Sequence, residues 1–193
     1  MKRAIVAFLL FWTAVMVHLN AQEHLRFMNI PIEGTMRRFA AKMETKGFVL
    51  DYAEEDGVQM TGTFIGRDCN LYMFKDPKTE KFRVVSVCFK KKYNSWYSLK
   101  GSYTKIVNGY IGKYGNPSKT AHTFLYPYYE GDGYEMSAVR SDNCRYWSYW
   151  EFDEGNIIVT ILKDAKIMIY YRDKLNGEER ENKIDFQDYY DDI

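Results

Sequence analysis

The sequence contains few of the residues, and none of the short motifs, on which most catalytic and metal sites depend. Its 193 residues include three cysteines and three histidines, without an HExxH or CxxC motif. Zinc sites and redox dithiols need such residues at close, regular spacing, so neither is expected. A GxSxG motif and a glycine-rich phosphate-binding loop are also missing. We therefore expect no metal and no cofactor, and an enzyme becomes the less favoured class.

The sequence also lacks an excess of charge of either sign. Its 27 basic and 26 acidic side chains give a formal net charge of +1. Proteins that bind nucleic acid are usually strongly basic, because phosphate contacts dominate their affinity, so no nucleic-acid partner is expected. The densest basic run, Lys90-Lys91-Lys92, follows an expected strand. Lysines in that position discourage pairing at a sheet edge.

Long apolar runs are missing except at the N-terminus. Lys2 and Arg3 precede a 14-residue apolar run over residues 4–17. This order is typical of a signal peptide, and the run is shorter than the roughly 20 residues that a membrane-spanning helix needs. We place cleavage after Ala21, with an uncleaved anchor as the alternative. The protein is then expected in the periplasm or outside the cell, without an integral membrane segment after cleavage.

The residues that are abundant favour a mixed fold. Two segments, residues 35–46 and 95–114, have apolar side chains at helical spacing, with Thr35 and Ser95 as N-caps and a glycine after each. The chain also has 17 Tyr and 12 Phe, and aromatic residues favour strands. Strand patterns occur at residues 48–52, 58–64, 71–74, 82–89, 134–139, 146–152, 157–162 and 167–171. These patterns predict an α+β fold, with two main helices on one face of an antiparallel sheet.

The order of these elements suggests two tandem halves. Each half reads as a helix, a glycine and then strands, and each contains a hairpin that begins at a cysteine. After the signal peptide (residues 1–21), we assign residues 22–94 to a first half and residues 95–193 to a second half with a C-terminal tail, in one compact unit. Chance similarity of hairpins is the alternative to a duplication. The charged tail ends in aromatic and aliphatic residues that would allow it to pack back on the fold: Phe186, Tyr189, Tyr190 and Ile193.

The first hairpin predicts a disulfide. If Asp76 faces Lys81 across a four-residue turn, equal counting along both strands places Cys69 opposite Cys88. Residues that face each other in an antiparallel pair are close enough to bridge, and exported chains can form disulfides. Similar counting on the second hairpin leaves Cys144 free, and we expect it to be buried. The alternative is that all three cysteines are reduced and buried.

The strongest candidate surface is aromatic. Along the strand at residues 146–152, side chains alternate between the two faces, so Trp147 and Tyr149 share one face and Tyr146 and Trp150 the other. One face should meet the helices and the other is available for binding. Four tyrosines of the preceding loop would extend that surface: Tyr126, Tyr128, Tyr129 and Tyr134. Exposed rings near polar groups suit a protein partner or a sugar, whereas the alternative is that these rings fill the core.

Polar residues near that loop support weaker interpretations. Glu130, Asp132 and Glu135 could meet a calcium ion, but their spacing matches no calcium loop, so a solvated turn is the better interpretation. His122 could serve as a base, although a histidine at a strand edge usually has no catalytic role. Neither set identifies a catalytic residue.

Three segments carry a resemblance: FMNIPIEGTMRRFAAKMETKGF, SLKGSYTKIVNGYIGKYGNPS and YPYYEGDGYE. With them the chain resembles a family of uncharacterised exported proteins of Gram-negative gut bacteria, which implies no particular activity. The tandem layout, with KYGNP after a helix, is also similar to the β-lactamase-inhibitor-like fold that small outer-membrane assembly lipoproteins share. That similarity implies a binding or inhibitory module and transfers no residue role.

We therefore expect an exported, non-enzymatic binding module. It would use the aromatic sheet face and the tyrosine-rich loop to bind a protein partner. A glycan or cell-envelope polysaccharide is the alternative ligand, and an enzyme of unknown class is the third possibility.

Overall fold

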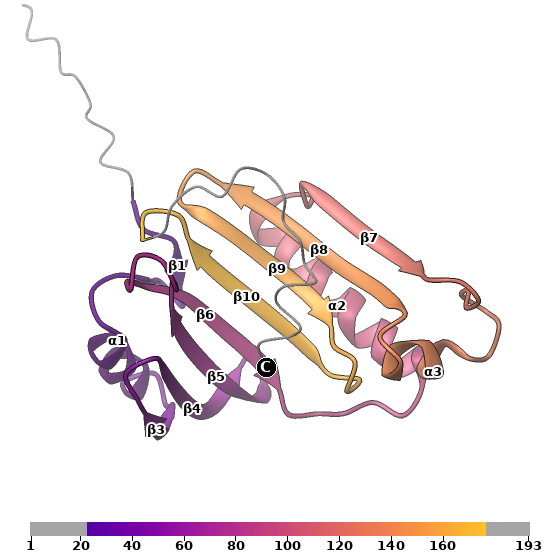
Figure 1. Ribbon diagram of the computed structural model, residues 1–193, viewed down its shortest axis with the longest axis horizontal. Coiled ribbons are helices and arrows are strands. Elements are labelled where there is room, and N and C mark those ends of the chain that lie inside the picture. Colours follow the sequence, from indigo (N-terminus) through magenta and orange to yellow (C-terminus); the bar gives the residue numbers. More distant parts are fainter. Residues whose placement is uncertain (1–22, 177–193) are drawn as a thin grey trace, which may run out of the picture.

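The computed structural model describes residues 23–176, so the expected signal peptide and the aromatic end of the C-terminal tail lie outside the described residues. Eight antiparallel strands form one sheet with the order β3-β4-β5-β6-β10-β9-β8-β7 (Figure 1). These strands are β3 (Val49–Ala53), β4 (Gly57–Phe64), β5 (Arg67–Lys75), β6 (Phe82–Phe89), β7 (Lys119–Phe124), β8 (Cys144–Phe152), β9 (Gly155–Ile161) and β10 (Ile167–Asp173). The other elements are a small hairpin, β1 (Arg26–Phe27) and β2 (Ile30–Pro31), and the helices α1 (Met36–Glu44), α2 (Trp96–Tyr114) and α3 (Glu135–Arg140). The predicted α+β class is confirmed.

The sheet is assembled from two runs of four strands. The first run, β3 to β6, follows α1, and the second run, β7 to β10, follows α2, with α3 inserted between β7 and β8. Within each run, strands pair with their neighbours in the sequence, and the last strands of the two runs, β6 and β10, pair in the middle. Val87 lies opposite Ile169 at this seam. The layout is therefore a helix followed by four strands, used twice.

Both predicted helices form and begin at the predicted caps. The Thr35 hydroxyl accepts a hydrogen bond from the Arg38 backbone N–H at 3.3 Å, and the Ser95 hydroxyl accepts one from the Ser98 N–H at 3.4 Å. These bonds satisfy N–H groups that lack partners within the helix. A glycine with positive φ follows each of these helices, as expected for a residue without a side chain.

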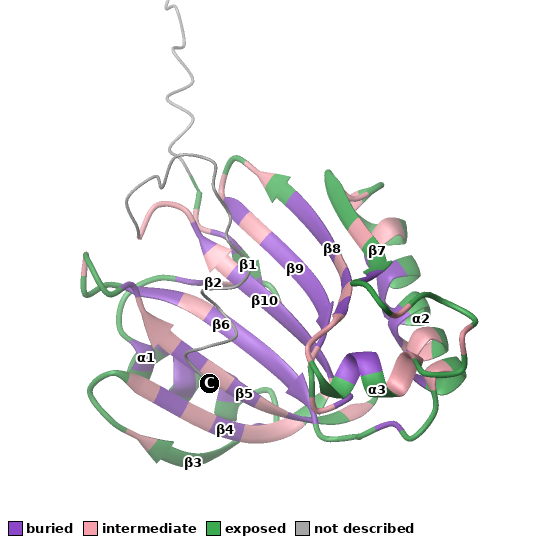
Figure 2. Cartoon of the chain, turned by 45° about the vertical axis from the view of Figure 1, so that its right-hand side comes forward, coloured by how far each residue is buried: buried purple, intermediate pink, exposed green. Residues whose placement is uncertain are grey.

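The main core lies between the helices and one face of the sheet. It includes the buried apolar residues of α1 and α2, and Phe39 of α1 packs against Phe82 of β6 with 5.1 Å between ring centroids. Figure 2 shows buried residues concentrated in the central strands, whereas the edge strands β3 and β7 are mostly exposed. Burial of apolar surface at about 25 cal/mol per Å² is the main stabilising contribution in such a core. None of the described helices combines the length and apolarity needed to cross a bilayer.

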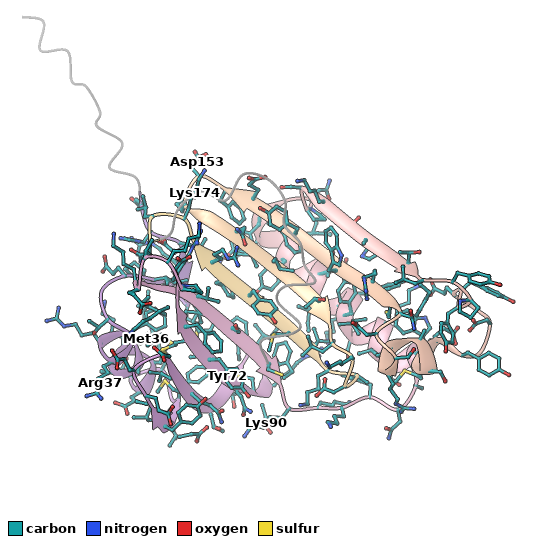
Figure 3. All side chains as sticks on the ribbon, viewed as in Figure 1. Met36, Arg37, Tyr72, Lys90, Asp153 and Lys174 are labelled. Carbon is teal, nitrogen blue, oxygen red and sulfur yellow. The ribbon has the colours of Figure 1, made fainter. Side chains whose placement is uncertain are left out.

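The other sheet face, which none of the described helices covers and which is called the open face below for that reason, carries a second apolar cluster. Its buried members are Cys88, Tyr149, Ile158, Met168 and Tyr170, with Tyr72, Val84, Trp147 and Leu162 packed against them. All of these residues lie in strands except Leu162, which directly follows β9. Tyr72 lies on this face, while Asp153 and Lys174 mark one end of the sheet (Figure 3). There the Lys174 backbone N–H donates to the Glu154 carbonyl at 2.8 Å.

Two segments differ from the predicted elements. The segment predicted as a strand at residues 134–139 lies in α3 except for its N-cap Tyr134, and the helix buries the neighbours Ala138 and Val139. A strand would point such neighbours to opposite faces, so the apolar pattern of this segment is helical. Strand β7 is missing from the predicted strands, although His122 was placed at a strand edge, because its sequence KTAHTF has mainly polar residues.

The predicted disulfide between Cys69 and Cys88 is wrong. Both thiols are free and buried, and so is Cys144, as predicted for that residue alone. The turn has the expected register, since the Asp76 N–H donates to the Lys81 carbonyl. Beyond it, the pairing shifts by one residue between Phe74 and Lys75, so Cys69 faces Phe89 and Cys88 faces Asn70. A shift of one residue exchanges the faces of the sheet, which places the two sulfurs on opposite sides.

Candidate functional site

The predicted aromatic residues of β8 divide between the two sheet faces as expected. Tyr146 and Trp150 join the core beneath the helices, whereas Trp147 and Tyr149 lie in the cluster of the open face. Tyr149 is only 3% exposed, and Trp147 is half-buried. Burial raises the pKa of Tyr149 to about 12. Tyr149 therefore offers little surface to a partner, and Trp147 offers part of its ring.

The loop at residues 125–134, called the tyrosine loop below, holds the other four candidates. Tyr126 is 95% exposed, Tyr129 66% and Tyr134 65%. Tyr128 is half-buried and packs against the main core, so it fixes the loop instead of facing solvent. Large exposed rings are costly in water, and a group of them is typical of a binding surface.

Glu130 anchors the tyrosine loop to the helix side of the molecule. Its carboxylate accepts hydrogen bonds from the Trp96 indole at 3.1 Å, from the Tyr146 hydroxyl at 2.8 Å and from the Lys100 ammonium. The hydrogen bond from Lys100, with those from Trp96 and Tyr146, lowers the pKa of Glu130. Because Tyr146 belongs to the helix-side core, this anchor does not reach the face of Trp147. The loop and the open-face aromatics therefore form two surfaces instead of the single one expected.

The other carboxylates of the loop hold its backbone. Asp132 accepts from the N–H groups of Tyr129 at 3.0 Å and Tyr134 at 2.6 Å, while Glu135 accepts from the Gly131 N–H at 2.8 Å. Such local bonds to backbone are typical of acidic residues in tight turns. Within residues 23–176, no group of three or more His, Cys, Asp or Glu side chains is placed to hold a metal ion.

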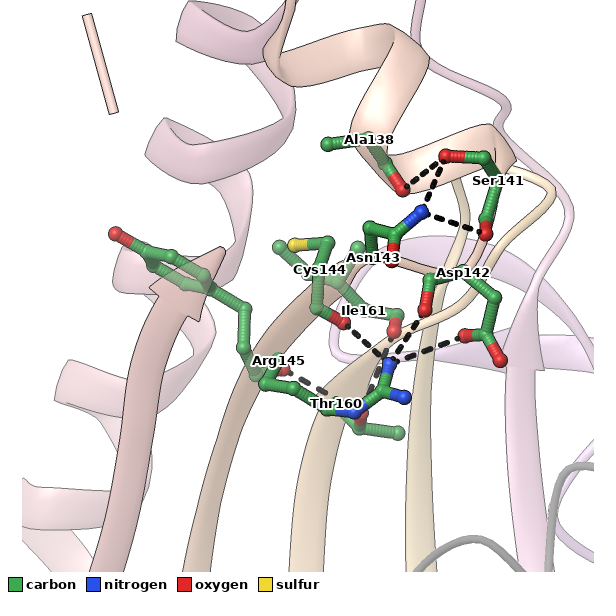
Figure 4. A network of polar contacts seen from close by, with 9 residues as sticks. Ala138, Ser141, Asp142, Asn143, Cys144, Arg145, Thr160 and Ile161 are labelled. Carbon is green, nitrogen blue, oxygen red and sulfur yellow. Dashed lines mark hydrogen bonds and ion pairs between the residues drawn. The ribbon is translucent and has the colours of Figure 1, made fainter. Parts of the chain in front are cut away.

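The turn between α3 and β8 is held by polar contacts of its own residues (Figure 4). The Arg145 guanidinium donates to the Asp142 carbonyl at 2.8 Å, and the Asn143 amide donates to the Ser141 hydroxyl at 2.9 Å. The Asn143 carbonyl in turn accepts from the N–H of Leu125, the first residue of the tyrosine loop, at 2.8 Å. The first residue of the loop is therefore tied to the turn before β8, while Glu130 ties the loop to α2.

His122 takes part in a hydrogen-bond chain instead of a catalytic pair. The Tyr103 hydroxyl lies 3.1 Å from His122 Nε2 and 2.8 Å from the Ser148 hydroxyl. Ser148 and Tyr103 are buried, so a substrate would not reach the serine. Burial, together with the Lys100 charge, lowers the pKa of His122. The arrangement fixes α2 against β7 and β8.

Sequence analysis missed the residues that position the tyrosine loop. Trp96 and Lys100 lie four residues apart on α2, a spacing that places them on one helix face. That spacing is a usable signal, but only the fold shows that the face meets Glu130. Trp96 also packs edge-on against Tyr146, with 4.7 Å between ring centroids. Comparison with known proteins adds no relative to this picture, because no family model, curated protein or solved structure matches the chain.

Proposed function

We propose that the protein is an exported binding module that uses the tyrosine loop to bind a protein partner. One observation carries this proposal: Tyr126, Tyr129 and Tyr134 are largely exposed on a loop whose backbone and base are held by hydrogen bonds. Export is supported by the signal-peptide pattern of residues 1–21. The repeated layout of a helix and four strands also fits the expectation of an inhibitor-like or binding module.

The physical case for a protein partner is the low cost of ordering this surface. Tyrosine has few rotatable bonds, a large apolar ring and a hydroxyl that forms hydrogen bonds, so tyrosines are enriched at binding hot spots. A loop that is already held loses less conformational entropy when a partner binds. The bonds made by Glu130 and Asp132 provide that restraint here. The open face is less suited, since Tyr149 is buried.

Capture experiments with matched variants test the proposal. The mature protein would be used as bait for the extracytoplasmic proteins of its own cells, alongside a Tyr126→Ala,Tyr129→Ala variant. A Tyr52→Ala variant, which changes a 44% exposed tyrosine on the distant edge strand β3, is the control. We expect the loop variant alone to lose the captured protein, with unchanged thermal stability. Equal capture by all baits would overturn the proposal.

Two further results would favour another binding site or another ligand. Loss of capture with Trp147→Ala but not with the loop variant would move the binding site to the open face. Binding to a glycan array, with quenching of tryptophan fluorescence by the same glycan, would favour the polysaccharide alternative. Both results would contradict a protein partner at the tyrosine loop.

A further inference from the structure

A groove lies on the helix side of the molecule, away from the tyrosine loop. It runs between α2 and the turn that joins β4 to β5, beside the β1–β2 hairpin, and has a cavity volume of about 540 Å³. Volumes of this size are typical of small-molecule sites. Its apolar lining includes Phe64, Ile65, Tyr110, Tyr114 and Tyr171. The Tyr110 and Tyr171 hydroxyls bond to each other there, and burial raises the pKa of both, so they remain neutral.

The charges around this groove are all of one sign. Its cationic lining residues are Arg26, Arg67, Lys105 and Lys113, and no carboxylate among the described residues lines it. Arg26 has an acidic neighbour, Glu23, at 3.6 Å, whereas Arg67, Lys105 and Lys113 form no ion pair within residues 23–176. Cations grouped around an apolar surface repel one another, and a bound anion would relieve that repulsion.

The face of α2 that borders the groove is shaped by a glycine. Lys105, Gly109 and Lys113 follow one another at intervals of four residues, so they lie on one face with the lysines about 12 Å apart along the axis. A Cβ on Gly109 would meet no atom within 4 Å, and the same is true of Gly101 and Gly112. None of these three glycines is therefore needed for close packing of α2 against the sheet. Glycine weakens an exposed helix, and at Gly109 its effect is to keep the groove open between two lysines.

We propose that this groove binds an anionic amphiphile, a molecule with a carboxylate, sulfate or phosphate on an apolar body. The apolar body would lie over Gly109 and contact the half-buried ring of Tyr114 and the exposed side chain of Ile65. The anionic group would pair with Arg67 and with one of the two lysines. Arg67 is already held in place, since its guanidinium donates to the Tyr93 hydroxyl at 3.4 Å and lies 5.7 Å from the centre of the Phe89 ring. This site is independent of the proposed function of the tyrosine loop.

The decisive test compares two glycines of the same helix. Gly109→Leu places a side chain in the groove, whereas Gly101→Leu makes the same change at an exposed position of α2 that does not line it. Both changes improve helix propensity, so neither variant is expected to unfold. The probe is monomeric dodecyl phosphate, followed by calorimetry and by displacement of anilinonaphthalene sulfonate. We expect Gly109→Leu to abolish binding and Gly101→Leu to bind like the unmodified mature protein.

Charge is tested separately. A Lys105→Gln,Lys113→Gln variant is expected to bind dodecyl phosphate about tenfold more weakly and with a smaller dependence on salt. Dodecyl maltoside, which has the same apolar chain without the charge, is expected to bind poorly to the unmodified protein. The proposal is overturned if both leucine variants bind dodecyl phosphate equally, or if dodecyl maltoside binds as tightly as the phosphate.

Vesicles distinguish a free ligand from a membrane lipid. Phosphatidylglycerol vesicles that bind the protein but not Gly109→Leu would identify a lipid headgroup as the anion. Binding of monomeric dodecyl phosphate without association to vesicles would identify a free amphiphile. Each result supports an anionic amphiphile in the groove and assigns its source.

Discussion

Arg83 lies where the register of the first hairpin shifts. Its buried guanidinium donates to the Asp76 carboxylate and, from Nε at 2.9 Å, to the Asp173 carbonyl. Burial alone would raise the pKa of Asp76, but the hydrogen bonds from Arg83 and from the backbone N–H groups of Thr79 and Lys78 lower it. The shift in pairing between β5 and β6 falls at this residue. A single buried ion pair thus accompanies the exchange of faces along the rest of the strand.

We predict that all three cysteines are present as thiols. Unfolding the mature protein in denaturant without a reductant should expose three groups that react with a thiol reagent. In the folded protein the reaction should be slow, because burial raises the pKa of Cys69 to about 11 and that of Cys144 to about 12. Mass spectrometry after alkylation would count the modified residues.

The observed register provides a positive control for this prediction. Asn70 faces Cys88 directly, so Asn70→Cys should form a disulfide with Cys88 under mild oxidation, whereas Cys69 should not. Peptide mapping would identify the bridge. A single reactive thiol in the unmodified chain would contradict the register described here.

At the residue scale, only part of the register of the first hairpin could be predicted from the sequence. The turn and its first pair, Asp76 and Lys81, follow from composition and counting. The shift at Arg83 does not, because it accompanies a contact between Arg83 and Asp173, which lies 90 residues away in the chain. On β8, by contrast, the predicted faces of Trp147 and Tyr149 follow from alternation along a single strand, and both residues lie in the cluster of the open face.

At the scale of elements, segments with strong local signals were predicted and segments fixed by distant contacts were not. The cap residues Thr35 and Ser95 define the starts of α1 and α2. The short helix α3 has no side-chain cap and depends on packing of Ala138 and Val139 in the core. The tyrosine loop was recognised from its composition, but the contact between Glu130 and α2 requires the assembled fold.

We predict that the charge of Glu130 holds the tyrosine loop to α2. Its folded-state pKa is lowered, so this stabilisation is fully present above the ordinary glutamate pKa of about 4.3 and is lost as the pH falls through the folded-state value. The Trp96 indole N–H proton should therefore shift in NMR spectra with a midpoint below about pH 4.3. Glu130→Gln keeps an acceptor for the indole but cannot titrate there.

The energetic effect of that variant should be small. The Lys100 and Glu130 side chains are each 42% exposed, so we expect Glu130→Gln to lower the free energy of unfolding by no more than about 1 kcal/mol at neutral pH. Faster hydrogen exchange in residues 125–134 should accompany it. An indole resonance that titrates identically in both proteins would show that Glu130 does not hold Trp96.

At the scale of the whole molecule, the order of the strands in the sheet could not be predicted from the sequence. Pairings between successive strands follow from short turns, but the seam between β6 and β10 joins segments about 80 residues apart and has no local signal. The seam nevertheless decides how the surfaces are arranged. It brings the two halves into one sheet and leaves the groove between α2 and the β4–β5 turn.

The seam predicts that the two halves unfold together. Of the four tryptophans, Trp12 lies in the expected signal peptide, and the other three, Trp96, Trp147 and Trp150, lie in the second half. Tryptophan fluorescence of the mature protein therefore reports on that half alone. Leu71→Ala removes a fully buried side chain from β5 in the first half, which should cost about 2–5 kcal/mol. Because β6 and β10 share one ladder, the urea midpoint seen by tryptophan fluorescence should fall with the midpoint seen by far-UV circular dichroism.

A matched change on the surface separates this coupling from a general effect of substitution. Leu50→Ala on the edge strand β3 alters a leucine that is 42% exposed, and its effect should stay within about 0.5 kcal/mol. If Leu71→Ala lowers the circular dichroism midpoint but leaves the tryptophan midpoint in place, the halves unfold independently. In that case the seam would be a contact between two stable units, and the groove on the helix side would lie across a boundary that opens without loss of either core.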